Sequence, residues 1–211
     1  MCGRFGQDIP GEWFEEEFDI YDIPDIHRED VRPTTTVAVI RQIDGEYVLY
    51  DTRWGLIDPK NMERAKKGPG DPVINVKVEN VHWYPLSNQP FYSGERVGFA
   101  VSYFEEWPDG VRTRIGMKSR EIMLFGGVFG VCNDREGQPV ECSSIFTTEA
   151  NELCAPLHPK KKRMPLILER EDWYRWLNPE TDPKSLLPIM KPYRSEPMDY
   201  WVVPEVQASL F

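Results

Sequence analysis

The chain has 211 residues, and its 12% aromatic content with seven tryptophans excludes a disordered chain and allows one substantial core. Its net charge of −10 disfavours nucleic-acid binding, although ten acids lie within residues 1–30 and basic clusters occur at 64–67 and 160–163. No apolar run approaches the roughly 20 residues of a membrane span, and the polar, acidic N-terminus does not resemble a signal peptide, so we expect a cytoplasmic or nucleoid-associated protein.

The first part of the chain predicts a helix followed by a hairpin. Residues 11–23 have aromatic side chains at helical spacing, which indicates a short acidic helix. Two β-branched runs within 31–57 flank Asp44-Gly45, a strong signal for a two-residue hairpin turn. The stretch 58–72 is rich in Lys, Gly and Pro and is expected to form a loop.

Most of the remaining chain predicts strands, at 72–81, 96–107, 121–132, 141–148 and 198–206. Three glycines in the strand at 121–132 indicate a bulge or a close backbone approach. The strand at 141–148 is expected to lead into a helix capped by Thr147 or Thr148. A short strand and a helix ended by Pro179 follow later in the chain.

Six to eight strands, a few short helices and no βαβ alternation together predict an α+β fold. The expected architecture is a single domain over residues 1–211, with a mixed, barrel-like antiparallel β core and a few short peripheral helices. The four cysteines show neither a CxxC pair nor zinc-type spacing, so we expect free thiols, and core packing for Cys132, Cys142 and Cys154. No metal and no cofactor are expected.

Cys2 directly follows the initiator methionine, whose removal we expect because cysteine is small. The mature chain would then begin with an α-amine and a thiol on the same residue. The α-amine has a pKa near 8, so a usable fraction is neutral at physiological pH. Such a 1,2-aminothiol condenses with an aldehyde to an imine, and the thiol then closes a thiazolidine ring. The alternative is an idle thiol at a chain terminus.

Polar residues in two strands could support such chemistry. Asn75, Lys77 and Glu79 alternate with apolar residues and should share one face, which is either solvated or the wall of a cleft. Glu105 and Glu106 are expected on opposite faces, one facing solvent and the other among aromatic side chains. There, desolvation would raise the pKa of the carboxyl and suit it to proton transfer. The alternation does not choose between the two.

His158 precedes the basic run "PKKKR". The neighbouring positive charge should lower the pKa of the imidazole and favour its neutral form near pH 7. Cys2, Asn75, one of the glutamates and His158 are therefore candidates for a common site, although their spacing does not show that they converge.

Several segments, in this order, resemble the SOS-response-associated peptidase (SRAP) family, whose members sense abasic sites and crosslink to single-stranded DNA. They are "MCGRF", "VRPTT", "RWGLI", "INVKVENV", "VSYFEEW", "IFTTEAN" and "LHPKKKRMPLIL". Each segment alone is a weak signal. With the last two segments counted as one match, six matches in the right order are specific, and they run nearly end to end.

The resemblance implies a role for each matching residue. Cys2 matches the nucleophile that forms a thiazolidine with the ring-opened sugar, and Asn75 the residue that positions the α-amine and the sugar. Glu106, directly before a tryptophan, matches the catalytic glutamate, and His158 the histidine that assists ring opening and crosslink reversal. The resemblance also implies a monomer, a basic DNA groove, weak lyase activity at the imine stage, and contacts to single-stranded DNA by Arg4, Lys77, Arg163, Trp54 and Pro33.

Four departures from the family pattern concern this site. Lys77 stands where the family usually has arginine, and Ser102 where an acid is common. Four residues separate His158 from Arg163 where the family usually has one, which puts the placement of His158 in question. Lys60 replaces a tryptophan that serves as a stacking wedge.

Two other functions remain open from the sequence. One is an N-terminal-nucleophile peptidase that removes its own leading residue, and the other is a non-catalytic module that binds single-stranded DNA or its junctions. The module would bind DNA in a salt-sensitive manner without forming a covalent product.

Overall fold

The computed structural model describes residues 3–57, 72–134, 136–158 and 160–204. Its strands are β1 (Phe5–Ile9), β2 (Ile26–Val31), β3 (Thr36–Ile43), β4 (Glu46–Trp54), β5 (Asn75–Lys77), β6 (Arg96–Val101), β7 (Tyr103–Glu106), β8 (Thr113–Met117), β9 (Met123–Asn133), β10 (Pro139–Glu149), β11 (Arg163–Pro165), β12 (Ile167–Leu168) and β13 (Met198–Val202). The α-helices are α1 (Gly11–Phe18), α3 (Pro85–Tyr92), α4 (Cys154–Leu157), α5 (Trp173–Leu177) and α6 (Pro183–Leu186). Single 3₁₀ turns are η1 (Val78–Asn80), η2 (Pro108–Gly110), η3 (Arg170–Asp172) and η4 (Leu187–Ile189).

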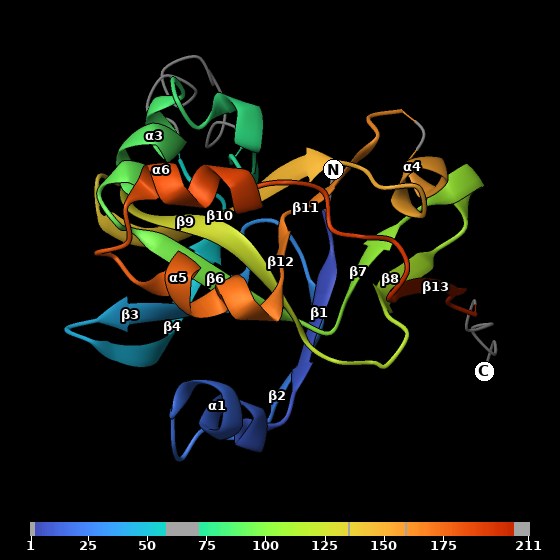
Figure 1. The fold of residues 1–211 in the computed structure, drawn as a ribbon, viewed down its shortest axis with the longest axis horizontal. Helices are drawn as coiled ribbons and strands as arrows, with labels where there is room; N and C mark the ends of the chain where they lie inside the picture. Colours follow the sequence, from blue (N-terminus) through green and yellow to red (C-terminus); the bar gives the residue numbers. More distant parts are fainter. Residues whose placement is uncertain (1–2, 58–71, 135, 159, 205–211) are drawn as a thin grey trace.

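Five strands close into a barrel. β3 pairs antiparallel with β4 and β6, β6 with β9, and β9 with β10, while β10 runs parallel to β4 and closes the ring. β5 and β11 add to β10, and β12 adds to β9. The α+β class with a mixed, barrel-like β core and short helices around it is therefore confirmed (Figure 1).

A second, antiparallel sheet has the order β13-β8-β7-β1-β2 and contains the first strand of the chain. The fully buried Gln7 of β1 joins this sheet to the barrel, since its amide nitrogen donates to the carbonyls of Ala38 (2.8 Å) and Ala100 (3.0 Å). Strand β1 is thereby held between the barrel and β7.

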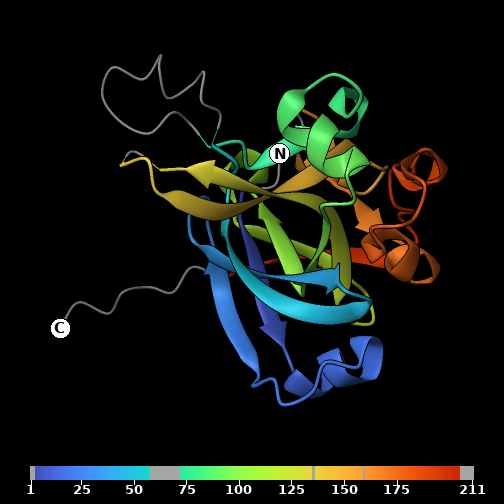
Figure 2. The same cartoon turned by 90° about the vertical axis from the view of Figure 1, so that its left-hand side faces the viewer.

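Helices α3, α5 and α6 gather on one side of the barrel (Figure 2). Arg96 of β6 is buried beneath them and donates to the carbonyls of Phe91 (2.8 Å), Trp176 (2.9 Å) and Asn178 (2.6 Å). Burial lowers the pKa of its guanidinium to about 10. One buried cation thus fastens two helices to the barrel through their backbone oxygens.

The local turn signals agree with the structure. Strands β3 and β4 form the expected hairpin, with Asp44 and Gly45 both at positive φ (51° and 89°). At Gly127 of β9, a Cβ atom would lie 2.4 Å from the Ser144 carbonyl oxygen, so the expected close backbone approach is confirmed. Cys142 and Cys154 are buried as expected, whereas Cys132 is half-buried.

Four expectations about individual elements are wrong. The helix expected over 11–23 ends at Phe18, because Asp19 adopts a left-handed conformation. The strand at 72–81 keeps only β5, and Glu79 lies in η1, so the shared face with Asn75 and Lys77 ends at Lys77. Ser102 divides 96–107 into β6 and β7, and the described part has thirteen strands rather than six to eight.

Thr147 and Thr148 do not cap a helix. Both lie buried within β10, and the next helix, α4, begins only at Cys154. The Asn151 side chain accepts a hydrogen bond from the Cys154 N–H at 2.9 Å. The loop expected at 58–72 lies outside the described residues except for Pro72, which belongs to no helix or strand. Among the described residues, no helix combines the length and apolar character needed to cross a membrane.

Candidate active site

Glu106 and His158 come together from segments far apart in the sequence. Glu106 is the last residue of β7, and His158 directly follows α4, where its N–H donates to the Cys154 carbonyl at 3.1 Å. His158 Nε2 lies 3.9 Å from Glu106 Oε2, an ion-pair distance when the imidazole is protonated. The fold therefore places two of the predicted proton-transfer groups side by side.

Burial controls the charge of Glu106. Its side chain is 13% exposed, and desolvation raises the pKa of the carboxyl from 4.5 to about 7. A carboxyl that titrates near neutral pH can both accept and donate a proton under physiological conditions. The raised pKa expected for one of the two adjacent acids is found at Glu106. The expectation that the other faces solvent is wrong, because Glu105 is 1% exposed.

The lengthened segment after His158 closes as a turn. The Lys162 N–H donates to the His158 carbonyl at 2.9 Å, and Lys162 has a left-handed conformation with φ 46°. Lys160, Lys161 and Lys162 are exposed, whereas Arg163 is buried at the start of β11. The three lysines are therefore exposed to solvent, and His158 still lies beside Glu106.

A hollow of about 380 Å³ lies beside Glu106. It is lined by Gly3, Arg4, Arg32, Pro33, Glu105, Glu106 and Trp107. Three of the predicted site residues, Arg4, Pro33 and Glu106, thus share one cavity. Cys2 directly precedes Gly3 in the sequence, but Cys2 itself lies outside the described residues, as does Lys60.

Asn75 and Lys77 lie on β5, which runs parallel to β10 with Asn75 beside Ile145 and Lys77 beside Thr147. Asn75 is half-buried and its side-chain oxygen is buried, whereas Lys77 is exposed. The two side chains therefore have different surroundings: the Asn75 amide oxygen is buried, and the Lys77 ammonium group is exposed to solvent.

Arg163 belongs to an internal ion pair. Its Nη1 donates to Glu79 Oε1 at 2.6 Å and its Nη2 to Glu79 Oε2 at 2.9 Å, and Nη2 also donates to the Thr147 carbonyl. These hydrogen bonds lower the pKa of the Glu79 carboxyl. With 8% exposure, Arg163 joins β11, β10 and η1, a structural arrangement that the sequence did not indicate.

Trp54 is fully buried, at the end of β4. Its Nε1 donates to the Ile74 carbonyl at 2.9 Å, and its ring packs edge-on against Phe5 at 4.8 Å between centroids. The ring, for which DNA contact was expected, is therefore part of the core, and it supports β1 and the segment before β5.

Glu105 is the charged residue whose role sequence reasoning missed. Its carboxylate accepts from Arg112 Nε (2.9 Å), Arg112 Nη2 (2.8 Å) and Arg114 Nε (3.1 Å), and it lies 3.4 Å from Arg4 Nε. The role of Glu105 could have been predicted from the turn at Pro108-Asp109-Gly110. A hairpin centred on this turn places Glu105 opposite Arg114, and the structure shows this pairing. An acid opposite an arginine on the next strand predicts an ion pair.

Among the described residues, no group of three or more His, Cys, Asp or Glu side chains could hold a metal ion.

The family model described as SOS response associated peptidase (SRAP) matches residues 1–208. The chain belongs to the SRAP family. The resemblance noted from the sequence motifs is therefore confirmed.

Two curated SRAP relatives cover nearly the whole chain. The abasic site processing protein YoqW of Bacillus subtilis (strain 168) is 31% identical over 213 residues, 96% of this chain and 92% of the relative. The abasic site processing protein YoaM of the same strain is 28% identical over 216 residues, 96% and 91% of the two chains. The crystal structure of a Bordetella bronchiseptica protein has a TM-score of 0.80 at 19% identity, with 96% and 100% coverage, so the fold is shared.

Ser102, which stands where the SRAP pattern often has an acid, links β1 to the start of β7. Its hydroxyl donates to the Gly6 carbonyl at 3.0 Å and accepts from the Asp8 N–H at 3.2 Å. The hydroxyl thus satisfies two backbone groups of β1 without placing a charge between the strands.

Proposed function

We propose that this protein processes abasic sites in single-stranded DNA by forming a covalent crosslink through Cys2. The α-amine of Cys2 attacks the C1′ aldehyde of the ring-opened deoxyribose and forms an imine with loss of water. The thiol then adds to the imine carbon, its proton passes to the nitrogen, and a thiazolidine results. The partner is one DNA strand bound by one protein molecule.

The observation that carries this proposal is the pairing of Glu106 with His158 beside the hollow that Gly3 lines. Opening the sugar ring requires removal of a proton from the 1′-hydroxyl and delivery of one to the ring oxygen. A carboxyl with a pKa of about 7 next to an imidazole suits both transfers. In the proposed site, Asn75 positions the amine and the sugar.

DNA contacts are proposed for Arg4, Lys77 and Pro33 at the surface. Arg163 and Trp54 support them from inside, since Arg163 is paired with Glu79 and Trp54 is buried. The names of the YoqW and YoaM relatives agree with abasic-site processing as the general role. Because an imine also permits β-elimination, weak strand cleavage should accompany the crosslink.

Intact-protein mass spectrometry after incubation with an abasic single-stranded oligonucleotide tests the proposal. The wild type should lack Met1 and gain the mass of the oligonucleotide less one water. Cys2→Ala should form no adduct, whereas Cys132→Ala, which removes a thiol elsewhere, should react normally. An adduct on Cys2→Ala would overturn the mechanism.

A second candidate is an N-terminal-nucleophile peptidase, because the family description names a peptidase. A fluorogenic peptide substrate assayed in parallel separates the two activities. Peptide cleavage by the wild type without a DNA adduct would favour the peptidase. Salt-sensitive DNA binding with neither product would favour a non-catalytic binding module.

A further inference from the structure

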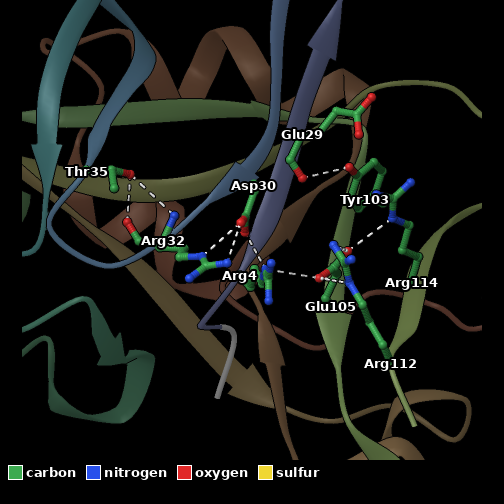
Figure 3. Close-up of polar contacts among 9 residues, drawn as sticks. All are labelled: Arg4, Glu29, Asp30, Arg32, Thr35, Tyr103, Glu105, Arg112 and Arg114. Atoms are coloured by element: carbon green, nitrogen blue, oxygen red, sulfur yellow. Dashed lines mark hydrogen bonds and ion pairs between the residues drawn. The ribbon is translucent and has the colours of Figure 1, made fainter. Parts of the chain in front are cut away.

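A charged cluster surrounds the buried Glu105 and extends beyond it. Arg112 and Arg114 reach the Glu105 carboxylate from β8 and the segment before it. On the other side, Arg4 lies between Glu105 and Asp30, with its Nε hydrogen-bonded to Asp30 Oδ1. Figure 3 shows these side chains as a row in which cations and carboxylates alternate.

Arg32 forms the other end of this row. Its Nε lies 2.8 Å and its Nη2 2.7 Å from Asp30 Oδ2. Hydrogen bonding to Asp30 raises the pKa of Arg32 and repulsion from Arg112 lowers it, so the two guanidinium groups are electrostatic neighbours. The row thus contains four guanidinium groups and two carboxylates, a local excess of two positive charges in a chain of net charge −10.

Other groups nearby leave this positive excess in place. The acid next to Glu105, Glu106, has its pKa raised to about 7 by burial and is only partly ionised at neutral pH. Glu29 contacts the cluster through its backbone, since its carbonyl accepts from the Tyr103 hydroxyl at 2.9 Å (Figure 3), and its carboxylate takes part in none of the ion pairs of the row.

The cluster borders the hollow beside Glu106. Arg4 and Arg32 line that hollow together with Trp107, a residue that is 41% exposed. The Arg32 side chain is 58% exposed and that of Arg112 32%, so both can meet a ligand while their carboxylate partners hold them. A guanidinium matches phosphate geometry with two parallel donors, and pre-orientation reduces the entropy lost on binding.

We propose that Arg32 and Arg112, held by Asp30 and Glu105, bind a backbone phosphodiester of the DNA strand at the rim of this hollow. This inference rests on the proposed function and adds two phosphate-binding residues to it. The adjacent Trp107 ring offers a stacking surface for a base of the same strand. The bound phosphate would fix the strand next to the Glu106–His158 pair.

Binding of an undamaged single-stranded oligonucleotide, followed by fluorescence anisotropy over a salt series, tests the inference without requiring a crosslink. Removal of one phosphate-binding cation should decrease the magnitude of the slope of log K against log salt by about 0.7. We expect Arg32→Ala and Arg112→Ala each to weaken binding about tenfold at low salt. Arg32→Lys and Arg112→Lys should lie between these variants and the wild type, because lysine keeps the charge but loses the fork.

Arg28→Ala is the matched control. Arg28 is also ion-paired, with Asp51, and its side-chain exposure of 33% is close to that of Arg112. Its removal should leave affinity and salt slope unchanged. Arg32 and its partner Asp30 are both exposed, so Arg32→Ala keeps the fold, and this variant alone decides the test.

Crosslinking of an abasic oligonucleotide by the same proteins separates the two proposals. A wild type that crosslinks, together with an Arg32→Ala variant of unchanged affinity and salt slope, would overturn the phosphate site and leave the proposed function intact. A wild type that binds undamaged DNA with the expected slopes but forms no adduct would reject the crosslinking function and support the phosphate site. A wild type that does neither would overturn both.

Discussion

At the scale of single residues, the two adjacent acids at the end of β7 show how position decides the charge state of a carboxyl. Glu105 is shared by three arginines, whereas Glu106 is desolvated beside His158 and its pKa rises to about 7. One residue of offset along a strand turns the side chain to the other face. The first acid is therefore the centre of an ion-pair cluster, and the second exchanges protons near neutral pH.

The raised pKa of Glu106 makes stability depend on pH in a definite direction. The folded protein keeps a proton that the unfolded chain releases above pH 4.5, so stability falls as pH rises from 4.5 through about 7. Glu106→Gln cannot ionise, and its stability relative to the wild type should increase by about 3 kcal/mol between pH 4.5 and pH 8. Urea denaturation at the two pH values measures this change. The exposed Glu180→Gln should show no such difference, and parallel pH profiles for wild type and Glu106→Gln would contradict the assignment.

The same carboxyl should govern the proposed crosslinking rate. Loss of a general acid–base group typically slows a reaction by about 10²–10⁴-fold, and we expect Glu106→Gln to fall in this range. The wild-type rate should also inflect near pH 7, where Glu106 titrates, and the variant should lack that inflection. Rapid-quench crosslinking over pH 5–9 provides the measurement, and a variant that retains the inflection would assign it to another group.

At the scale of elements, β10 organises the polar side of the site. It carries β5 on one edge and β11 on the other, so Lys77 and Pro165 flank Thr147. Arg163 then ties β11 to η1 through Glu79. Strand β5, which carries Asn75, has only three residues. Its position therefore depends on these bonds to neighbouring elements.

Removing the Arg163 side chain should loosen that arrangement. Arg163→Ala leaves the Thr147 carbonyl and Glu79 without their donor, and we expect a loss of about 2–4 kcal/mol. Glu79→Gln should cost less, because Glu79 is half-exposed and solvent compensates for the missing pair. Urea denaturation of both single variants and the double variant gives the coupling energy. A coupling energy of zero would show that the pair is not formed in solution.

The lysine turn at 160–162 is expected to act on DNA binding and not on chemistry. Its three side chains are exposed, whereas the His158 backbone holds the turn through the Lys162 N–H. Replacing Lys160 and Lys162 with serine should reduce the salt slope of single-stranded DNA binding by up to about 1.4, since each phosphate contact contributes about 0.7. Lys161 is kept in this variant, because its charge lowers the pKa of Glu106. Crosslinking at saturating DNA should stay unchanged. A slower reaction at saturation would instead indicate that the turn positions His158.

At the scale of the whole molecule, the barrel and the second sheet share a core that holds the first strand in place. Phe5 of β1 packs edge-on against Trp54, Phe99 and Phe125 of the barrel. Gln7 adds two hydrogen bonds to barrel carbonyls. Strand β1 is therefore attached to the barrel both by its aromatic packing and by its hydrogen bonds.

Substitutions at Trp54 distinguish a role in core packing from a direct contact with DNA. Trp54→Ala should destabilise the fold by about 3–5 kcal/mol, as removal of a buried large aromatic side chain does. Trp54→Phe should lose less stability and keep its affinity for single-stranded DNA, because the ring is buried. Urea denaturation and fluorescence anisotropy distinguish the cases. Weaker DNA binding by a Trp54→Phe variant of unchanged stability would show that the indole contacts DNA.

Local sequence was sufficient wherever a feature depends on neighbouring residues. The Asp44-Gly45 turn, the end of α5 before Pro179 and the last strand, β13, all follow from short-range signals. The order of the motifs was sufficient to indicate the family. The alternation of polar and apolar residues did not predict the bounds of strands such as β6. All six residues of β6 are buried, because both faces of the strand are covered, and no polar face marks its ends.

The α+β class, the main hairpin and the set of candidate residues follow from the amino-acid sequence alone, because turn chemistry and motif order are local properties of the chain. The positions of Glu105 among arginines, of Trp54 and Arg163 in the interior, and of His158 beside Glu106 follow from the folded structure. These outcomes depend on pairing between β7, β8, β10 and β11, and on the burial that follows. Desolvation and ion pairing arise from neighbours that are distant in sequence, and the folded chain alone brings them together.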